Sequence, residues 1–147
     1  MDKYMKAAID EARTGINAGD GGPFGCVIVK NGEIIGRGHN EVVKQKDPTC
    51  HGEVMAIRNA CKNAGTYDLT GCELYTTAEP CPMCRGAILW ANIRKVYYGC
   101  NIEDTDKIGF RDKIFYESPD DIAVELDRKE CLEVFEEYAA ITDKKDY

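Results

Sequence analysis

The sequence lacks the features that would place it in or across a membrane. Its 147 residues contain no run near the ~18 consecutive apolar residues that a membrane-spanning helix requires. The first twelve residues are polar and amphipathic, without the apolar core of a secretory signal peptide. Repeats, low-complexity tracts and linkers are also missing. We therefore expect a single domain over residues 1–147, located in the cytoplasm.

Basic residues are in deficit. Lysine and arginine number 19 against 26 aspartate and glutamate residues, which gives a formal net charge of −7. Affinity for nucleic acid comes largely from basic side chains that neutralise phosphates. This balance argues against a general nucleic-acid binder and suits a small, uncharged ligand.

Histidine is scarce and cysteine is abundant, with two of the first and eight of the second. Thiols stay reduced in the cytoplasm, so we expect packing, metal binding or catalysis rather than a disulfide framework. Cys81 and Cys84 alone have a metal-ligand spacing. Packing is the expected role of the other six, which are Cys26, Cys50, Cys61, Cys72, Cys100 and Cys131.

The apolar pattern predicts alternating helices and strands. Helical spacing predicts helices over residues 3–17, 51–64 and 82–91. Asn31-Gly32 between β-branched runs predicts a hairpin of strands 26–29 and 34–35. Further strands are expected over residues 72–76 and 95–99. This order indicates an α/β fold in which a mixed sheet lies between helices.

Two segments are harder to assign. Residues 41–49 are expected to form a polar loop. Beyond Asn101 we expect another polar loop, a strand at Ile122 to Leu126, and a helix near Cys131 to Ala140.

Two short motifs carry most of the chemistry: His51-Gly52-Glu53, and Pro80-Cys81 followed three residues later by Cys84. One imidazole and two thiols are three zinc ligands, and a catalytic zinc site leaves its fourth position to water. Both cysteines lie at a predicted helix start, where the helix dipole favours the thiolate. We expect one Zn²⁺ per chain, held by His51, Cys81 and Cys84.

Glu53 is the candidate proton carrier. Residues i and i+2 do not face each other on a helix, so Glu53 can approach the metal only if His51 lies at the helix cap. Pro48 supports that position because proline disfavours helix before it. A carboxylate beside a metal-activated water can move a proton to a departing amine. Two alternatives are a closed structural zinc site completed by His39 or another cysteine, and a redox dithiol.

The chain resembles the cytidine and deoxycytidylate deaminase-like superfamily, whose signature is H-x-E with P-C-x-x-C. Within it, the chain is most similar to the bacterial guanine deaminase family. The resemblance extends along most of the sequence. It rests on the two motifs together with residues 21–25, Asn40, 47–49, 56–58, 87–88, Trp90-Ala91, Gly109-Phe110, Asp112 and the terminal Lys144-Lys145-Asp146-Tyr147.

The resemblance implies a three-layer α/β/α fold with a central five-stranded mixed sheet. It also implies a homodimer in which segments of about residues 117–147 are exchanged between partners. The expected reaction is hydrolytic deamination of guanine to xanthine and ammonia. The alternatives are deamination of tRNA adenosine, cytosine, a free nucleoside or an aminotriazine, or a zinc-stabilised binding protein without turnover.

The resemblance also assigns roles to residues outside the two motifs. By their matching positions, Phe24 and Trp90 would contact the base, Asn40 would hydrogen-bond it, Asp112 would assist proton transfer, and Tyr147 would reach the site from the tail. By residue type alone, the two aromatic rings suit a core equally well, Asn40 a turn, Asp112 a solvated surface and Tyr147 a frayed terminus.

One position departs from the resemblance. Gly52 stands where many relatives have alanine, which loosens the first helical turn by up to about 1 kcal/mol. We expect its peptide N–H to contact the base all the same.

Overall fold

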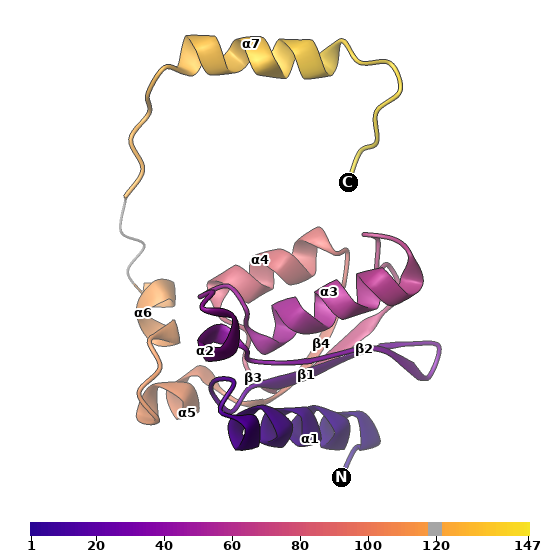
Figure 1. Cartoon of the computed structure of the whole chain (residues 1–147), viewed down its shortest axis with the longest axis vertical. Coiled ribbons are helices and arrows are strands. Elements are labelled where there is room, and N and C mark those ends of the chain that lie inside the picture. The colour runs from indigo at the N-terminus through magenta and orange to yellow at the C-terminus, as the bar shows by residue number, and fades with distance from the viewer. Residues whose placement is uncertain (118–121) are drawn as a thin grey trace.

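The chain is described here by a computed structural model that covers residues 1–117 and 122–147 (Figure 1). Along the chain the elements are α1 (Lys3–Ala18), β1 (Gly25–Lys30), β2 (Glu33–His39), α2 (Val42–Gln45), α3 (Gly52–Ala64), β3 (Glu73–Ala78), α4 (Pro82–Trp90), β4 (Lys95–Cys100), α5 (Ile102–Lys107), α6 (Asp112–Glu117) and α7 (Arg128–Ala139). No helix in the described ranges is both long enough and apolar enough to span a membrane.

A mixed sheet lies at the centre, with the strand order β2-β1-β3-β4. β1 runs antiparallel to β2 and β3, whereas β3 and β4 are parallel. The turn between β1 and β2 has positive φ at both Asn31 (49°) and Gly32 (82°). The hairpin expected from Asn-Gly is therefore confirmed, because the primed turns need this left-handed backbone.

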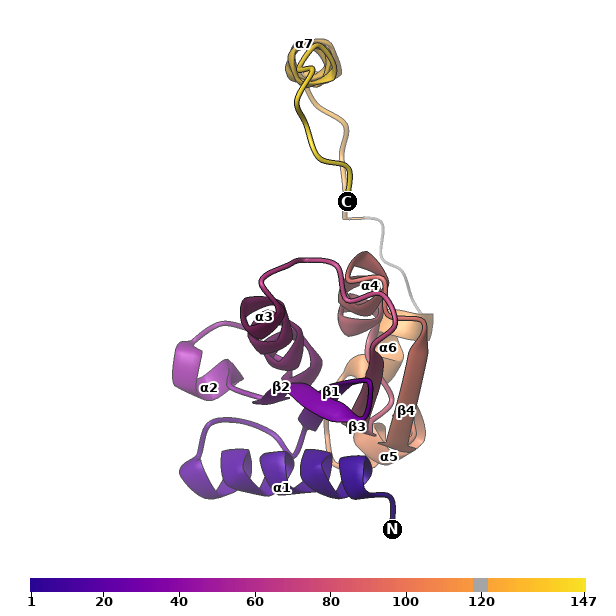
Figure 2. The ribbon, with the colours of Figure 1, turned by 90° about the vertical axis from the view of Figure 1, so that its right-hand side faces the viewer.

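Helices cover both faces of the sheet, as the end view in Figure 2 shows: α1 lies on one side, α3 and α4 on the other. Successive residues of β1 are buried on opposite faces, as strand geometry requires. Cys26 and Ile28 join the larger core beneath α3 and α4, while Val27 and Val29 pack toward α1. This confirms the three-layer α/β/α class.

Close packing holds α3 directly against β2. Gly36 and Gly38 face the helix, and a Cβ atom on Gly38 would lie 2.4 Å from the backbone nitrogen of Ala56. The two backbones are in direct contact because neither glycine carries a side chain. The first residues of α3 are held in turn at the end of the sheet where β2 finishes.

The expectation of a fifth strand was wrong for the described residues of this chain. Four strands pair in the described residues. Ile122 to Leu126 is irregular chain, with Ile122 and Val124 each 89% exposed. A strand needs a neighbouring strand for its backbone hydrogen bonds, and among the described residues of this chain no strand pairs with the segment. Residues 118–121 of the expected exchange segment lie outside the described ranges.

Two expected loops contain helices. The loop over residues 41–49 includes α2, and the stretch after Asn101 includes α5 and α6. A reciprocal capping box starts α5: the Asn101 side chain accepts from the Asp104 N–H, and the Asp104 carboxylate accepts from the Asn101 N–H. Such short helices have too few turns to show an apolar period.

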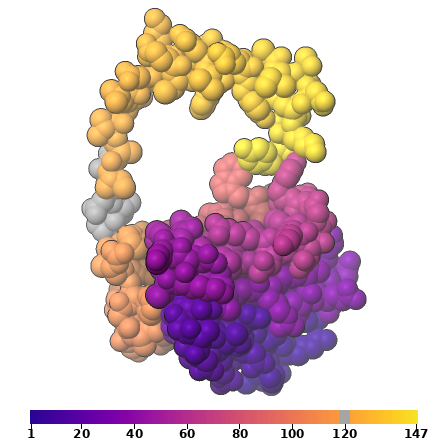
Figure 3. Space-filling view, viewed as in Figure 1, coloured from indigo at the N-terminus to yellow at the C-terminus, as the bar shows by residue number. Residues whose placement is uncertain are grey.

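The C-terminal helix stands apart from the sheet. Figures 1 and 3 show α7 arching away from the rest of the chain, and none of its residues is buried. The helix predicted near residues 131–140 is confirmed, beginning three residues earlier. Its apolar side chains, including Val134 and Phe135, remain exposed.

Two glycines allow the packing argument to be tested. We expect Gly38→Ala to lower the free energy of unfolding by about 2 kcal/mol, because its Cβ would meet the backbone of α3. Gly86→Ala is the matched control. It lies inside α4 with open space at the Cβ position, so we expect a gain of about 0.5 kcal/mol. Urea unfolding curves measure both, and equal effects would contradict the packing argument.

Candidate metal centre

His51 lies at the N-cap of α3 in extended conformation, with φ −71° and ψ 159°. Its side chain therefore leaves the helix end rather than its flank. Glu53, two residues later, lies in the first turn and is only 6% exposed. This is the cap position that the sequence required for the imidazole and the carboxylate to converge.

Cys81 and Cys84 are positioned in the same way by α4. Cys81 is the N-cap, also extended, and Pro82 begins the helix. Cys84 lies in the first turn, so both sulfurs lie at the positive end of the helix dipole. The N-termini of α3 and α4 meet, and both thiols are buried there.

The three side chains have the spacing of a tetrahedral metal site. The His51 Nδ1 atom lies 3.5 Å from the Sγ atoms of both Cys81 and Cys84. Tetrahedral zinc, with Zn–S of about 2.3 Å and Zn–N of about 2.0 Å, separates nitrogen and sulfur ligands by about 3.5 Å. Within the described ranges, no further histidine, cysteine or carboxylate completes this group. The donor set fits a zinc ion with one open position.

The ionisation of these ligands is coupled. A hydrogen bond from the Cys84 thiol, aided by nearby His51, lowers the pKa of Cys81 to about 4. The pKa of Cys84 is raised, because it shares a proton with Cys81 and is buried. Hydrogen bonding to Cys81 raises the pKa of His51. Protons on Cys84 and His51 would therefore leave when a cation binds.

The Glu53 carboxyl group is buried beside this centre. Its Oε1 atom accepts a hydrogen bond of 2.9 Å from the Thr76 hydroxyl on β3. Burial raises the pKa of Glu53, because the interior disfavours its charged form. A raised pKa suits a group that must both accept and donate a proton near neutral pH. Sequence reasoning missed Thr76, although strand alternation places it on the same face as Leu74 and the α3 side of the core.

A cavity of about 340 Å³ opens onto the metal centre. His51, Glu53 and Cys81 form its floor. One wall comes from the turn after α1 and the start of α2, and the other from α6 and the two residues before it. The residues around it are Gly21, Gly22, Phe24, Asn40, Val42, Val43, Pro48, Ala78, Glu79, Phe110, Arg111, Asp112 and Phe115.

Polar and aromatic groups shape the first wall. Asn40 is 5% exposed, and its Oδ1 atom accepts the Val42 N–H at 3.1 Å, which leaves the amide nitrogen as a donor for a ligand. A Cβ atom on Gly21 would lie 2.1 Å from this Oδ1 atom. The Phe24 ring meets Phe110 edge-on, with ring centroids 4.8 Å apart. The two rings present apolar surface suited to a flat heterocycle.

The second wall carries Asp112, which is half-buried. Burial raises its pKa, and the nearby Cys81 adds to that shift. The Arg111 guanidinium lies 5.5 Å from the centroid of the Phe115 ring. The Tyr116 hydroxyl donates to the Pro80 carbonyl, which links α6 to the residue before the first cysteine ligand. Phe115 and Tyr116 were not identified from the sequence, because a short helix among polar residues gave no pattern.

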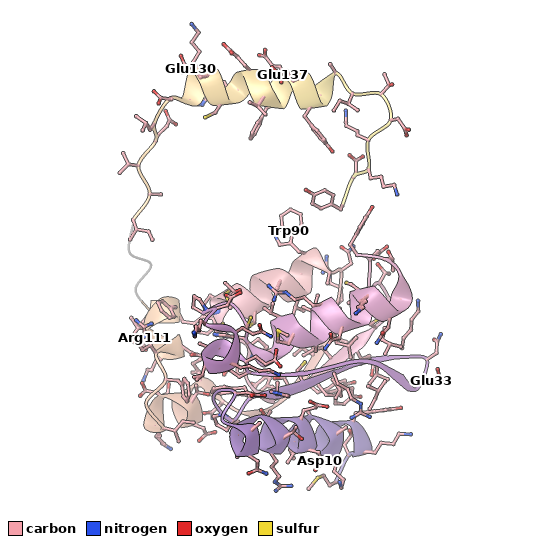
Figure 4. All side chains as sticks on the ribbon, viewed as in Figure 1. Asp10, Glu33, Trp90, Arg111, Glu130 and Glu137 are labelled. Atoms are coloured by element: carbon pink, nitrogen blue, oxygen red, sulfur yellow. The ribbon has the colours of Figure 1, made fainter. Side chains whose placement is uncertain are left out.

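Three of the expected substrate-binding residues do not line the cavity of their own chain. Trp90, at the end of α4, is 68% exposed, and Figure 4 shows it pointing away from the sheet. Tyr147 lies near it, with ring centroids 6.1 Å apart. Gly52 is buried between two lining residues, His51 and Glu53, and a Cβ atom on it would be 2.9 Å from the Phe24 carbonyl oxygen. By contrast Phe24, Asn40 and Asp112 all line the cavity.

Known proteins are similar to this chain in sequence and in fold. The profile of the cytidine and deoxycytidylate deaminase zinc-binding region matches residues 1–100. The chain is 44% identical to guanine deaminase of Bacillus subtilis, over 99% of this chain and 98% of that protein. The crystal structure of that enzyme superposes with a TM-score of 0.93, covering 100% of this chain and 99% of the other. A tRNA-specific adenosine deaminase of Aquifex aeolicus is 46% identical over 65% of this chain and 62% of its own length.

Loss of one sulfur ligand tests the metal centre. We expect Cys84→Ser to weaken zinc binding by at least about a hundredfold, the upper end of losses caused by outer-shell changes. Cys72→Ser, which alters an equally buried cysteine of the core, should keep one zinc per chain. Elemental analysis of the purified proteins measures both. In the unaltered protein, zinc affinity should fall with falling pH, because the ligands must lose protons.

Proposed function

The chain belongs to the cytidine and deoxycytidylate deaminase family, in its bacterial guanine deaminase branch, and from this membership we propose that it hydrolyses guanine to xanthine and ammonia. The observation that carries the proposal is the buried Glu53 beside a three-ligand site that opens onto a flat, aromatic cavity. A purely structural metal site has no use for such a carboxylate. The net charge of −7 also suits a small uncharged base better than an RNA.

In this proposal, His51, Cys81 and Cys84 hold the metal. A zinc ion held by these ligands would lower the pKa of a water molecule enough for hydroxide, the stronger nucleophile, to form near neutral pH. Glu53 takes the proton released by the water and delivers it to the exocyclic nitrogen. The carbon–oxygen bond forms at the amine-bearing carbon, the carbon–nitrogen bond breaks, and the nitrogen leaves as ammonia.

The cavity walls orient the base. Phe24 offers a face for the ring, and the Asn40 amide donates to one of its acceptors. The Gly52 N–H, at the open first turn of α3, contacts the base edge. Asp112, with its raised pKa, stands on the opposite wall where it can exchange a proton with the leaving amine. Trp90 and Tyr147 would join the site only from a partner chain.

Replacement of the proton carrier tests the chemistry. We expect Glu53→Gln to lower kcat on guanine by about a thousandfold while zinc content is unchanged. Glu33→Gln, the same change on an exposed residue of the hairpin, should leave turnover unaltered. Ammonia release and xanthine absorbance are the readouts. An active Glu53→Gln enzyme would refute the mechanism.

A substrate panel tests the identity of the base. Guanine, cytosine, cytidine, an aminotriazine and tRNA are compared at equal zinc content. Preference for tRNA would instead favour the activity named for the Aquifex aeolicus relative, whose similarity covers 65% of the chain.

We also propose that the chain forms a homodimer in which segments of about residues 117–147 are exchanged. β4 is an edge strand of the four-stranded sheet, with unpaired backbone groups along one side. Beside it lies a groove of about 300 Å³, lined by Ile88, Leu89, Val96 and Tyr98 among others. The tail provides matching apolar residues: Ile122, Val124 and Leu126 alternate along extended chain and are exposed. A partner's tail on β4 would supply the missing fifth strand.

Alternation along the tail provides a test of the exchange. We expect Val124→Ser to raise the dimer dissociation constant about a hundredfold, because two symmetric copies each lose about 1.5 kcal/mol of apolar burial. Glu125→Ser, one residue on, would face the opposite side of the strand and should change the constant little. Sedimentation or light scattering over a dilution series measures both. A monomeric parent protein would refute the exchange.

Free cysteines support a cytoplasmic location. All eight are unpaired, and two must stay reduced to bind a metal.

A further inference from the structure

A second group of titratable side chains surrounds His39 at the end of β2. The imidazole Nε2 atom lies 2.8 Å from Oδ2 of Asp20, and Nδ1 lies 3.2 Å from Oε2 of Glu11. The Glu41 carboxylate lies 3.8 Å from Nε2. Each of these four side chains is at most 20% exposed. The Lys44 ammonium lies 3.2 Å from Glu41 and 4.0 Å from Asp20.

The charge state of this cluster follows from its geometry. Both ring nitrogens face carboxylate oxygens, which only accept hydrogen bonds. A neutral imidazole carries one N–H and one lone pair, so it would turn that lone pair toward a carboxylate. The imidazolium donates at both positions. Burial alone would lower the pKa of His39, but hydrogen bonds to Asp20 and Glu11 outweigh burial and the pKa is raised.

The charged groups that face the ring come from three directions among the described residues. They are Glu11 of α1, Asp20 of the following turn, and Glu41 with Lys44 at the start of α2. The helix α3 packs on the other side of β2, against its glycines. Three carboxylates therefore face one lysine and one histidine, a balance that favours a protonated ring.

This cluster is connected directly to the substrate cavity. Three of its members are each followed in the chain by a residue that lines the first wall. These pairs are Asp20-Gly21, His39-Asn40 and Glu41-Val42. The Asp20 carbonyl also accepts hydrogen bonds from the N–H groups of Val43 and Lys44, which attaches the turn to α2. Movement within the cluster would therefore move the wall.

We propose that protonated His39 is a positioning residue for the substrate cavity. By donating to Asp20 and Glu11 it holds the turn after α1 at a fixed distance from the start of α2. It thereby sets where the Asn40 amide meets the base. His39 is not itself part of the cavity lining, so it acts only through its neighbours. This inference rests on the proposed function for its kinetic consequence.

A metal ion is the other occupant that the cluster could hold, since Asp20, His39 and Glu41 have ligand atoms within 4.8 Å of one another. The hydrogen bonds favour the imidazolium, which has no lone pair to offer a metal. A second zinc per chain that is lost in Asp20→Asn would overturn the proposal.

Two neighbouring residues of α1 provide matched variants. Glu11→Gln removes the negative charge from one hydrogen-bond partner of the His39 ring, while its amide oxygen remains a weaker, uncharged acceptor. Asp10→Asn makes the same change of charge one residue away, where the carboxylate is exposed and pairs with Lys6. Long-range electrostatic effects on the cavity are thus alike, and the contact with the ring is the difference.

The protonation state of His39 is measured by nuclear magnetic resonance on the zinc-loaded protein. The chain has two histidines, so the assignment is short. We expect both His39 ring nitrogens to carry protons at pH 6.5, with a pKa lowered in Glu11→Gln and unchanged in Asp10→Asn. A neutral ring at pH 6.5 in the parent protein, or equal pKa values in all three proteins, would overturn the proposal.

Kinetics on guanine test the effect on binding. We call the two hydrogen bonds from protonated His39 to Asp20 and Glu11 the clamp. The pKa of His39 is raised on folding. The clamp is therefore complete below the ordinary histidine pKa of about 6.5 and is lost as pH rises through the raised value. We expect KM to rise about fivefold over that interval while kcat changes little. The inflection should move to lower pH in Glu11→Gln and stay in place in Asp10→Asn. Protonation changes of guanine itself affect the KM of all three proteins equally, so they cancel when the proteins are compared.

His39→Gln serves as a second variant, because its amide donates from one nitrogen only and carries no charge. Its KM should stay at the raised value across the same pH range, with kcat and zinc content close to those of the parent. An inflection that persists unchanged in His39→Gln would exclude His39 as its source and overturn the proposal.

Hydrogen exchange separates this inference from the proposed function. The Val42 N–H donates a hydrogen bond to the Asn40 side chain. Without any substrate present, its hydrogen should exchange with solvent about fivefold faster in Glu11→Gln than in Asp10→Asn. If the parent protein has no guanine turnover, the proposed function fails while the exchange and titration results still test the clamp. Equal Val42 exchange in both variants would overturn the clamp even in an active enzyme.

Discussion

The convergence of two helix N-termini at one end of the sheet is the constraint on which the site depends. His51 and Cys81 are both N-cap residues in extended conformation, so their side chains leave the helices axially and meet. Cys84 follows from the first turn of its helix. The positive ends of two helix dipoles lie where thiolates must form. If either helix began one residue later, a ligand would turn away from the other two.

The packing behind this convergence also buries Glu53, the proposed proton carrier. α3 lies directly on β2 because Gly36 and Gly38 carry no side chain. Its first turn then places Glu53 at the cavity floor, where it accepts a hydrogen bond from the Thr76 hydroxyl on β3. The packing of α3 on the sheet therefore contributes both to the burial of Glu53 and to the position of His51 in the metal centre. Because α3 and α4 pack on the same sheet, few additional residues are needed to orient the site.

Local signals in the sequence predicted most of the fold and the metal centre. Asn31-Gly32 needs positive φ, Pro82 suits a first helical turn, and the H-x-E spacing requires a capping histidine, so each feature is determined within a few residues. The second cavity wall was not predictable in this way. Phe115, which lines this wall, lies on a short helix, and that helix is attached by a hydrogen bond from Tyr116 to Pro80, which is distant in sequence. The expected fifth strand failed within one chain because strand formation needs a partner strand. His39 appeared only as a spare histidine, because its carboxylate partners come from three separate segments.

The glycine at position 21 has a consequence for attempts to change which base the cavity accepts. Any side chain there would displace the Asn40 amide, whose oxygen stands 2.1 Å from the unoccupied Cβ position. A substitution at position 21 would therefore displace the polar group of Asn40 before it changed the shape of the cavity. The wall formed by α6 and the residues before it is different, since Phe110 and Phe115 line the cavity and neither is a glycine packed against a neighbouring polar group. Engineering for a different amine-bearing base should begin with those two rings and leave the glycine turn untouched.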